Sequence, residues 1–261
     1  MGAGGKDASQ IQSEVKEYYG ETLATTSDLK TNACCTMNAP PKEIRDILAK
    51  VPSEVIAKYY GCGSPLPQGI EGLHVLDLGC GSGRDCYVAS KLVGPTGRVT
   101  GVDMTPQQLE VARKHQDAYA AILGYENMSF LQGTIEDLSA IPSDSIDIII
   151  SNCVVNLSPD KPAVLKEAYR VLRHGGEFYF SDVYGDRRLP KALTQHKVLV
   201  GECIGGALYE QDFLRIARRV GFEDPRVLDS APIDVKDPQL IELVGEAKFT
   251  SVTYRLFKLP G

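Results

Sequence analysis

The 261-residue sequence predicts an α/β fold in which helices cover both faces of a doubly wound, mainly parallel sheet. From residue 73 onward, short apolar stretches alternate with amphipathic stretches of helical length, which is the pattern of repeated β-α units. A glycine-rich turn over 79–83 follows the first apolar stretch. The fourth apolar stretch, 146–151, contains three consecutive isoleucines, which indicates a strand buried on both faces.

Periodicity and turn residues assign the remaining elements in chain order. The N-terminal part predicts helices over 9–20, 41–50 and 53–60 and a loop over 26–40. Strands are expected at 74–78, 98–102, 128–132, 146–151 and 177–182, and helices at 84–92, 106–123 and 161–172. We place the end of the last of these helices at His174-Gly175-Gly176. The tail predicts helices at 191–200, 210–220 and 237–247 and strands at 225–234 and 249–258, which can add an antiparallel edge.

Charge and cysteine content exclude several classes of protein. The chain carries 28 Lys and Arg against 34 Asp and Glu, a formal charge of −6, with no basic run, so we expect no nucleic-acid or membrane partner. Neither an apolar run of membrane-spanning length nor an apolar signal stretch is present, and we expect a cytoplasmic protein. Seven scattered cysteines without a C-x-x-C pair argue against a disulfide framework or a zinc ribbon.

The glycine-rich turn is the first candidate binding site. Gly79, Gly81 and Gly83 let the backbone pass close to a ligand. A dinucleotide fingerprint needs a glycine where Arg84 stands, so a pyrophosphate cradle is disfavoured. Asp77, which directly precedes the turn, instead suits a cationic group such as an amino-acid ammonium.

Two later turns extend this site. Asp103 ends the second predicted strand, where an acidic side chain chelates the two ribose hydroxyls of a nucleoside. After the third strand, in the turn 133–136, Ile135 can cover an adenine face and a polar neighbour, Thr134 or Glu136, can accept from its amine. Ammonium, ribose and adenine together describe S-adenosylmethionine, which we predict as the cofactor.

Beyond these turns, the chain resembles the arsenite S-adenosylmethionine methyltransferases from about residue 28 to its end. The segments that carry the resemblance are 28–34, 59–63, 83–88, 151–157 and 201–208. The last two are the most specific, because each places a cysteine where generic methyltransferases have none. The resemblance implies a class I S-adenosylmethionine-dependent methyltransferase core, Rossmann-like in its sheet, with a smaller arsenic-binding module. It also implies a role in arsenic detoxification.

The resemblance assigns roles to four cysteines. Cys62, Cys153 and Cys203 would hold trivalent arsenic, which is soft and prefers thiolate ligands. Cys34 and Cys62 would reduce arsenic after methylation and form a disulfide, and thioredoxin or glutathione would reduce this disulfide back to two thiols. Cys35 directly follows Cys34, so either can be the assisting thiol. Arsenite and methylated trivalent arsenicals are the expected substrates.

The complete prediction divides the chain and its site as follows. Residues 1–72 would form N-terminal helices and mobile Cys-bearing loops, 73–185 the cofactor-binding domain, and 186–261 an arsenic-binding region that completes the sheet. Tyr60 can lie against the sulfonium in a cation–π contact. The predicted cofactor-binding residues are Tyr60, Asp77, Gly79, Gly81, Gly83, Arg84, Asp103, Met104, Thr134, Ile135, Glu136, Asn152 and Val154.

Two other functions stay open at this point. The chain can be a methyltransferase for another small molecule, with cysteines that only pack. It can also be a metalloid-binding protein that uses the cofactor to hold its shape and performs no turnover.

Overall fold

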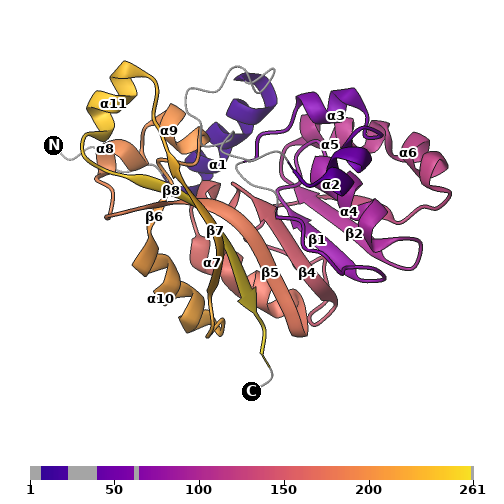
Figure 1. Ribbon diagram of the computed structural model, residues 1–261. Coiled ribbons are helices and arrows are strands. Elements are labelled where there is room, and N and C mark those ends of the chain that lie inside the picture. The colour runs from indigo at the N-terminus through magenta and orange to yellow at the C-terminus, as the bar shows by residue number, and fades with distance from the viewer. Residues whose placement is uncertain (1–6, 23–39, 62–64, 260–261) are drawn as a thin grey trace.

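The computed structural model of the protein describes residues 7–22, 40–61 and 65–259, and these form an eight-stranded sheet with helices on both faces (Figure 1). The strand order is β3-β2-β1-β4-β5-β8-β7, with the short β6 beside β5. The order reverses between β1 and β4, which is the switch point of a doubly wound sheet. The predicted fold class is therefore confirmed.

The strands divide into a parallel part and an antiparallel edge. The parallel strands are β1 (His74–Leu78), β2 (Arg98–Asp103), β3 (Met128–Gln132), β4 (Ile146–Asn152), β5 (Leu172–Gly185) and β6 (Leu208–Tyr209). β8 (Phe249–Phe257) runs antiparallel to β5, and β7 (Arg226–Ile233) runs antiparallel to β8. The tail thus adds the antiparallel edge that the sequence predicted.

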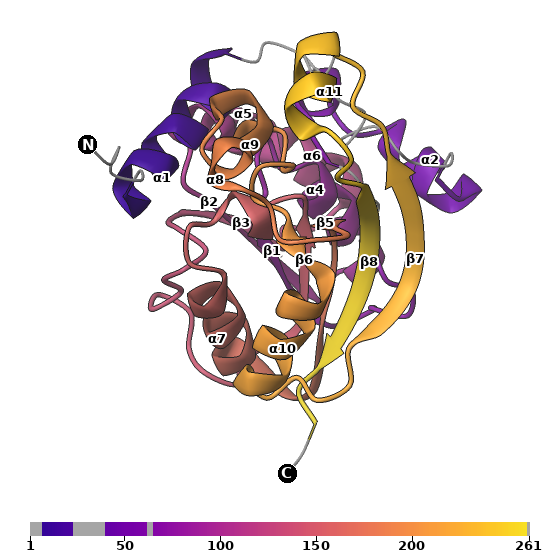
Figure 2. The same ribbon diagram turned by 90° about the vertical axis from the view of Figure 1, so that its left-hand side faces the viewer.

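Helices cover the sheet in two layers and form a group at its upper end (Figures 1 and 2). One layer contains α2 (Lys42–Leu48), α3 (Ser53–Ala57), α4 (Arg84–Val93), α5 (Pro106–Lys114) and α6 (Gln116–Leu123). The other contains α7 (Lys161–Val171) and α10 (Glu210–Val220). The group at the end contains α1 (Ala8–Glu17), a π-helix (Tyr18–Thr22), a 3₁₀ turn (Val155–Leu157), α8 (Lys191–Thr194), α9 (Lys197–Gly201) and α11 (Pro238–Val244).

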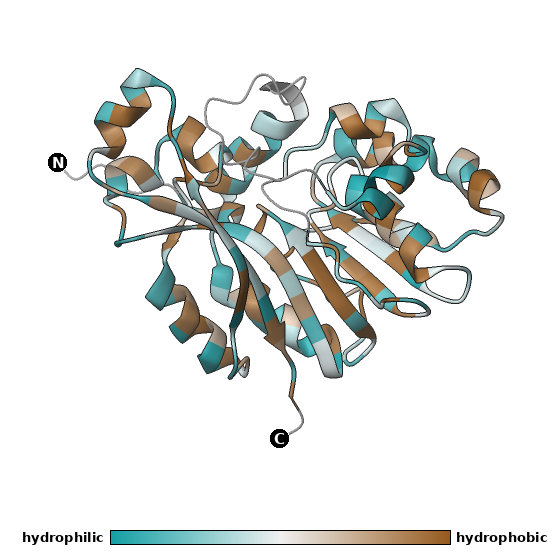
Figure 3. Ribbon diagram, in the orientation of Figure 1, coloured by the Kyte–Doolittle hydropathy of each residue, from teal (hydrophilic) through white to brown (hydrophobic). Residues whose placement is uncertain are grey.

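The central strands are apolar because both of their faces are covered (Figure 3). Ile148 and Ile150 pack into the core beneath α4 and α5, whereas Ile149 packs into the opposite core beneath α7 and α10. A third apolar cluster lies under α8, α9 and α11 and includes Cys153 and Cys203. Among the described residues, no helix combines the length and apolar character that a membrane crossing requires.

Three predicted elements differ from the structure. The helix expected over 106–123 is interrupted at His115, whose φ of −105° and ψ of 0° leave helical geometry while its ring contacts Glu54 at 2.8 Å. The helix expected over 191–200 is likewise two helices, α8 and α9. His174-Gly175-Gly176 belongs to β5, because the backbone of Gly175 and Gly176 pairs with Lys258 at the end of the chain.

Candidate active site

A cleft opens where β1, β2 and β4 end, at the switch point of the sheet. It contains about 920 Å³ of space, including its open mouth. The predicted cofactor-binding residues that line it are Tyr60, Asp77, Gly79, Gly81, Asp103, Met104, Thr134, Ile135, Glu136, Asn152 and Val154. Gly83 and Arg84 do not line it, so the structure brings together most of the predicted set.

The glycine turn forms the floor of this cleft. Gly79 and Cys80 both donate backbone hydrogen bonds to the Val102 carbonyl, which ties the turn to β2. A Cβ on Gly79 would overlap the Val154 side chain, so that position admits only glycine. Gly83 has a φ of 87° and begins α4, which explains its glycine without a ligand contact.

Three carboxylates lie in or beside the turn. Asp103 accepts hydrogen bonds of 2.8 Å from the backbone N–H groups of Gly81 and Thr105, which fixes its position in the cleft. Burial raises the pKa of Asp103, and burial together with the neighbouring charge of Asp85 raises the pKa of Asp77 well above its usual range. A cationic ligand would relieve this accumulation of buried negative charge.

Tyr59, Tyr60 and Arg84 lie close to one another at the wall of the cleft, and of the two predicted residues Tyr60 lines it whereas Arg84 does not. The Arg84 guanidinium lies 3.8 Å from the ring centre of Tyr59 and 3.1 Å from Asp85, and it is buried. Tyr59 also accepts a hydrogen bond from Asn152. Tyr60 lines the cleft and packs edge-on against Tyr19 at 5.6 Å. Arg84 therefore packs behind the wall of the cleft and is not among the residues that line it.

The apolar part of the cleft suits a flat ring. Ile135 is buried and lines the cleft together with Met104 and Val154. Glu136 accepts a 2.5 Å hydrogen bond from the Ser158 hydroxyl, so its carboxylate is held at the cleft wall. The residues of the 133–136 turn thus lie where the sequence placed them.

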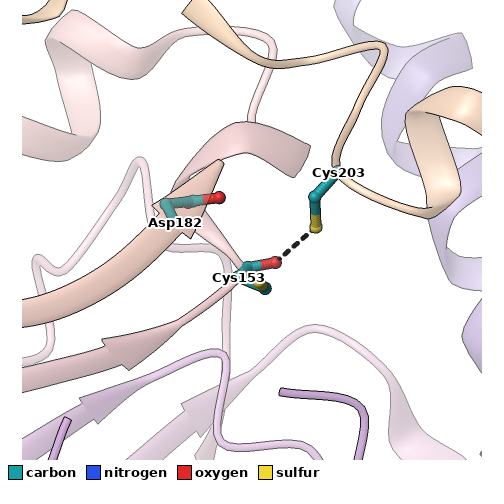
Figure 4. A group of neighbouring side chains, drawn as sticks. All are labelled: Cys153, Asp182 and Cys203. Atoms are coloured by element: carbon teal, nitrogen blue, oxygen red, sulfur yellow. Dashed lines mark hydrogen bonds between the residues drawn. The ribbon is translucent and has the colours of Figure 1, made fainter. Parts of the chain in front are cut away.

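A second group of side chains lies beside the cofactor cleft. The ligand atoms of Cys153, Asp182 and Cys203 lie within 4.8 Å of one another, and all three residues are buried (Figure 4). The Cys203 thiol donates a 2.8 Å hydrogen bond to the carbonyl of Cys153. Cys153 also lines the cofactor cleft, so this residue belongs to both sites.

The backbone at the two cysteines is unusual. Cys153 and Cys203 have φ angles of 57° and 64°, a region that non-glycine residues rarely adopt. Gly205 and Gly206 follow Cys203 closely in the chain. A Cβ on Gly206 would overlap the Asn156 carbonyl, so only a glycine allows the chain to pack this closely there. Strain of this kind concentrates at functional sites. The glycines after Cys203 therefore allow its segment to reach Cys153.

The oxidation state of the cysteines bears on arsenic binding. Cys153 is disulfide-bonded, so it must be reduced before its sulfur can bind arsenic. Cys34, Cys35 and Cys62 lie outside the described residues, and the roles predicted for Cys34 and Cys62 are not tested by the geometry. Two of the cysteines predicted to hold arsenic, Cys153 and Cys203, fall within the described ranges, and their ligand atoms lie within 4.8 Å of each other.

Sequence reasoning missed Asp182 and Lys161. The Asp182 carboxylate accepts from the backbone N–H groups of Asn156 and Val183, at 2.9 and 2.8 Å, and burial raises its pKa to about 7. Burial lowers the pKa of Lys161 to about 8, against the opposing effect of Asp182 and Cys203. The position of Asp182 near the end of β5 was the available signal, because ligands bind at that edge.

The N-terminal helices also contribute to the cleft, which the sequence did not indicate. Gln12, Val15 and Tyr19 line it. Gln108 of α5 donates a 3.0 Å hydrogen bond to the Tyr19 carbonyl, which attaches this N-terminal segment to the cofactor domain. No local motif marks such a contact, because it joins segments that are far apart in the chain.

Comparisons with known proteins agree with this geometry. The sequence model of a family described as "Methyltransferase domain" matches residues 70–221. The chain is 54% identical to an arsenite methyltransferase of Aquipseudomonas alcaligenes, covering 96% of this chain and 73% of the relative. It is 49% identical to the Homo sapiens arsenite methyltransferase, covering 96% and 68% respectively.

Solved structures give the same result. A crystal structure of an arsenic(III) S-adenosylmethionine methyltransferase from Chlamydomonas reinhardtii superimposes with a TM-score of 0.82 at 62% identity. The match covers 85% of this chain and 76% of that one. The YcgJ protein of Bacillus, at 18% identity and a TM-score of 0.54, shares the fold.

Proposed function

The chain belongs to the arsenite methyltransferase family, and on that premise we propose how its residues bring S-adenosylmethionine and trivalent arsenic together. Its activity is S-adenosylmethionine-dependent methylation of arsenite, which serves arsenic detoxification in this family. The observation that carries the proposal is that Cys153 both lines the cofactor cleft and lies within 4.8 Å of Cys203 and Asp182. One residue thus connects the two sites.

The donor groups of the cleft fit S-adenosylmethionine. When bound, the cofactor supplies a methyl group on a positively charged sulfonium. Asp77 would receive the ammonium group, and Asp103, already fixed by two backbone N–H groups, would accept from the ribose hydroxyls. Ile135 would cover the adenine. The close approach of Gly79 to Val154 shapes the space between these groups.

Cys153 and Cys203 would hold arsenic beside that cleft. Thiolates suit this soft element better than the carboxylate of Asp182, which is already engaged with two backbone N–H groups. Asp182 would instead fix the backbone that carries Cys153, through Asn156 and Val183. Holding substrate and cofactor in one cleft supplies the proximity and orientation that methyl transfer needs.

The remaining thiol roles complete the proposal. Cys62 would be the third arsenic ligand, and Cys34 or Cys35 with Cys62 would reduce the methylated product. Thioredoxin or glutathione would then return the thiols to their reduced state. The disulfide at Cys153 supports the need for a reductant, because arsenic cannot bind an oxidised sulfur.

We also propose which role each of three parts of the chain has. Residues 73–185 would bind the cofactor, 186–261 would supply Cys203 and the sheet edge formed by β7 and β8, and 1–72 would close the cleft. Chemistry that depends on reduced thiols fits a cytoplasmic location, since thiols stay reduced there.

The test is product speciation. The reduced protein is incubated with arsenite, S-adenosylmethionine and glutathione, and arsenic species are separated and identified by mass spectrometry. Methylated arsenicals that accumulate with time support the proposal. Tight arsenite binding without methylated product would favour a binding protein, and methylation of organic acceptors with none of arsenite would favour another methyltransferase.

A further inference from the structure

Two thiols that the arsenic site does not use lie together under the glycine turn. Cys80 belongs to the turn and Cys86 to the first turns of α4, and both are buried free thiols. They face each other across Gly101 of β2, where an added Cβ would lie 2.8 Å from the Cys80 sulfur and 2.9 Å from the Cys86 sulfur. Each thiol is within hydrogen-bonding reach of the other.

This pair is connected to the cofactor cleft in two ways. Cys80 lines the cleft, so a small solute that enters it reaches Cys80 when the cofactor is absent, and Cys86 lies fully buried behind it. The Cys86 thiol donates a 3.2 Å hydrogen bond to the Asp77 carboxylate, which is the group that would receive the cofactor ammonium. A ligand on the two sulfurs would therefore change both the turn and Asp77.

The chemistry of buried thiols favours a particular class of ligand. Burial raises the pKa of Cys80 to about 11 and raises that of Cys86 as well, so both stay protonated and react slowly in steps that need a thiolate. The overall condensation with a trivalent arsenical consumes neutral thiols and releases water, so its balanced equation contains no thiolate. Each S–H bond is replaced by an S–As bond, and the proton leaves with an arsenic-bound oxygen as water.

We propose that Cys80 and Cys86 form a second binding site for trivalent arsenicals, and that occupation of this site competes with S-adenosylmethionine. Arsenious acid would lose two waters on binding both sulfurs and keep one hydroxide, and arsenic stays trivalent throughout. The inference rests on the proposed function only for the identity of the metalloid.

Competition follows from two physical effects. Arsenic between the two sulfurs needs space that the packed turn 79–83 now occupies, so the turn must shift from its position on β2. The Cys86 proton also leaves, and Asp77 loses the hydrogen bond that it accepts from this thiol. Both changes act on groups that line the cofactor cleft.

The probe is phenylarsine oxide, which condenses with two thiols and releases one water. We would replace the other cysteines, Cys34, Cys35, Cys62, Cys153 and Cys203, by serine and count adducts by native mass spectrometry. One adduct is expected, and saturating S-adenosylmethionine should suppress it. At a tenfold excess over its own dissociation constant, the arsenical should raise the apparent Kd of S-adenosylmethionine about tenfold in calorimetry.

The matched control adds Cys80→Ser to this variant, which should abolish the adduct and the effect on cofactor binding. No adduct, or an adduct that leaves the Kd of S-adenosylmethionine unchanged, overturns the proposal. If the five-serine variant does not fold, adducts are counted on the full chain and on its Cys86→Ser variant. A loss of one adduct supports the site and an unchanged count overturns it.

The two proposals fail separately. A chain that methylates arsenite but forms no adduct at this pair loses only the second site. A chain that forms the adduct but yields no methylated arsenic loses the proposed function.

Discussion

The cofactor side and the arsenic side of the cleft are built in different ways. Asp77, the glycine turn and Asp103 come from two neighbouring strands, β1 and β2, and short backbone hydrogen bonds connect them. Cys153 and Cys203 are fifty residues apart and meet only through the packing of α9 and its following turn against the end of β4. The cofactor side therefore depends on contacts between neighbouring strands, whereas the arsenic side depends on contacts between distant parts of the chain. A substitution on one side should impair that side and leave the other intact.

The largest expected effect is on the arsenic side. Cys203→Ser should abolish methylation of both arsenite and monomethylated arsenic, because serine oxygen is a poor ligand for a soft element. Cys203 does not line the cofactor cleft, so S-adenosylmethionine affinity should be unchanged in calorimetry on the same protein. Methylation at the unaltered rate would remove Cys203 from the site.

The assisting thiols should behave differently. Cys34→Ser and Cys62→Ser should stop methylation of arsenite but spare a monomethylated substrate, which already has one carbon ligand and needs two thiolates. Product speciation with each substrate separates the two groups of variants. Equal loss of both activities in all four cysteine variants would contradict the division into holding and assisting thiols.

Asp103→Ala tests the cofactor side. Loss of hydrogen bonds from the ribose costs roughly 1.5–3 kcal/mol each, which weakens S-adenosylmethionine binding about 10- to 100-fold. Arsenite binding, followed by adduct mass, should survive because the thiols are untouched. Asp103→Asn keeps one accepting oxygen and should lose less. Unchanged cofactor affinity in the alanine variant would place the ribose elsewhere.

A smaller effect is expected from Gly206→Ala. The added Cβ would overlap the Asn156 carbonyl and push the Cys203 segment away from Cys153. Arsenite affinity should fall about tenfold, while S-adenosylmethionine affinity stays within twofold. Gly245→Ala is the control for backbone strain, since its Cβ meets no atom within 4 Å and only its positive φ of 60° opposes the substitution, whereas Gly206 has no positive φ. Equal effects of the two variants would show that general strain, and not the thiol geometry, is responsible.

This contrast also explains which features the sequence could predict. The strands of the parallel sheet, the glycine turn, Asp103 and the 133–136 turn follow from local patterns, because a parallel strand and the turn after it are read from one short stretch. Cys203 was identified through family resemblance alone, since no periodicity indicates that residue 203 reaches residue 153. Asp182 was missed because its role is to accept N–H groups of a segment brought to it by folding.

The break at His115 and the extension of β5 through Gly175 have the same cause. In each case a tertiary partner, Glu54 or Lys258, overrides the local preference of the chain. The N-terminal lining residues were missed for this reason too, because Gln108 holds Tyr19 from another element.

The smallest expected effect is on the free energy of unfolding, which the buried Asp77 of the cofactor side should lower. Because burial raises the folded-state pKa of Asp77 above the ordinary value of about 3.9, the folded chain holds this proton more tightly than the unfolded chain does. The free energy of unfolding is therefore highest below the unfolded pKa and falls as pH rises toward the folded pKa. Asp77→Asn removes this loss, so the variant should be more stable than the unaltered protein without cofactor.

Urea unfolding at about pH 5 and about pH 8 measures the difference, and the variant should gain on the order of 1 kcal/mol at the higher pH. It should also bind S-adenosylmethionine more weakly, because the amide cannot balance the ammonium charge. Asp85→Asn is the contrasting variant: it leaves the buried Arg84 without its anion 3.1 Å away, so it should lower stability. If Asp77→Asn is also less stable at both pH values, Asp77 supports the fold and does not oppose it. The residue that binds the cofactor ammonium would then not lower the free energy of unfolding of the protein without cofactor.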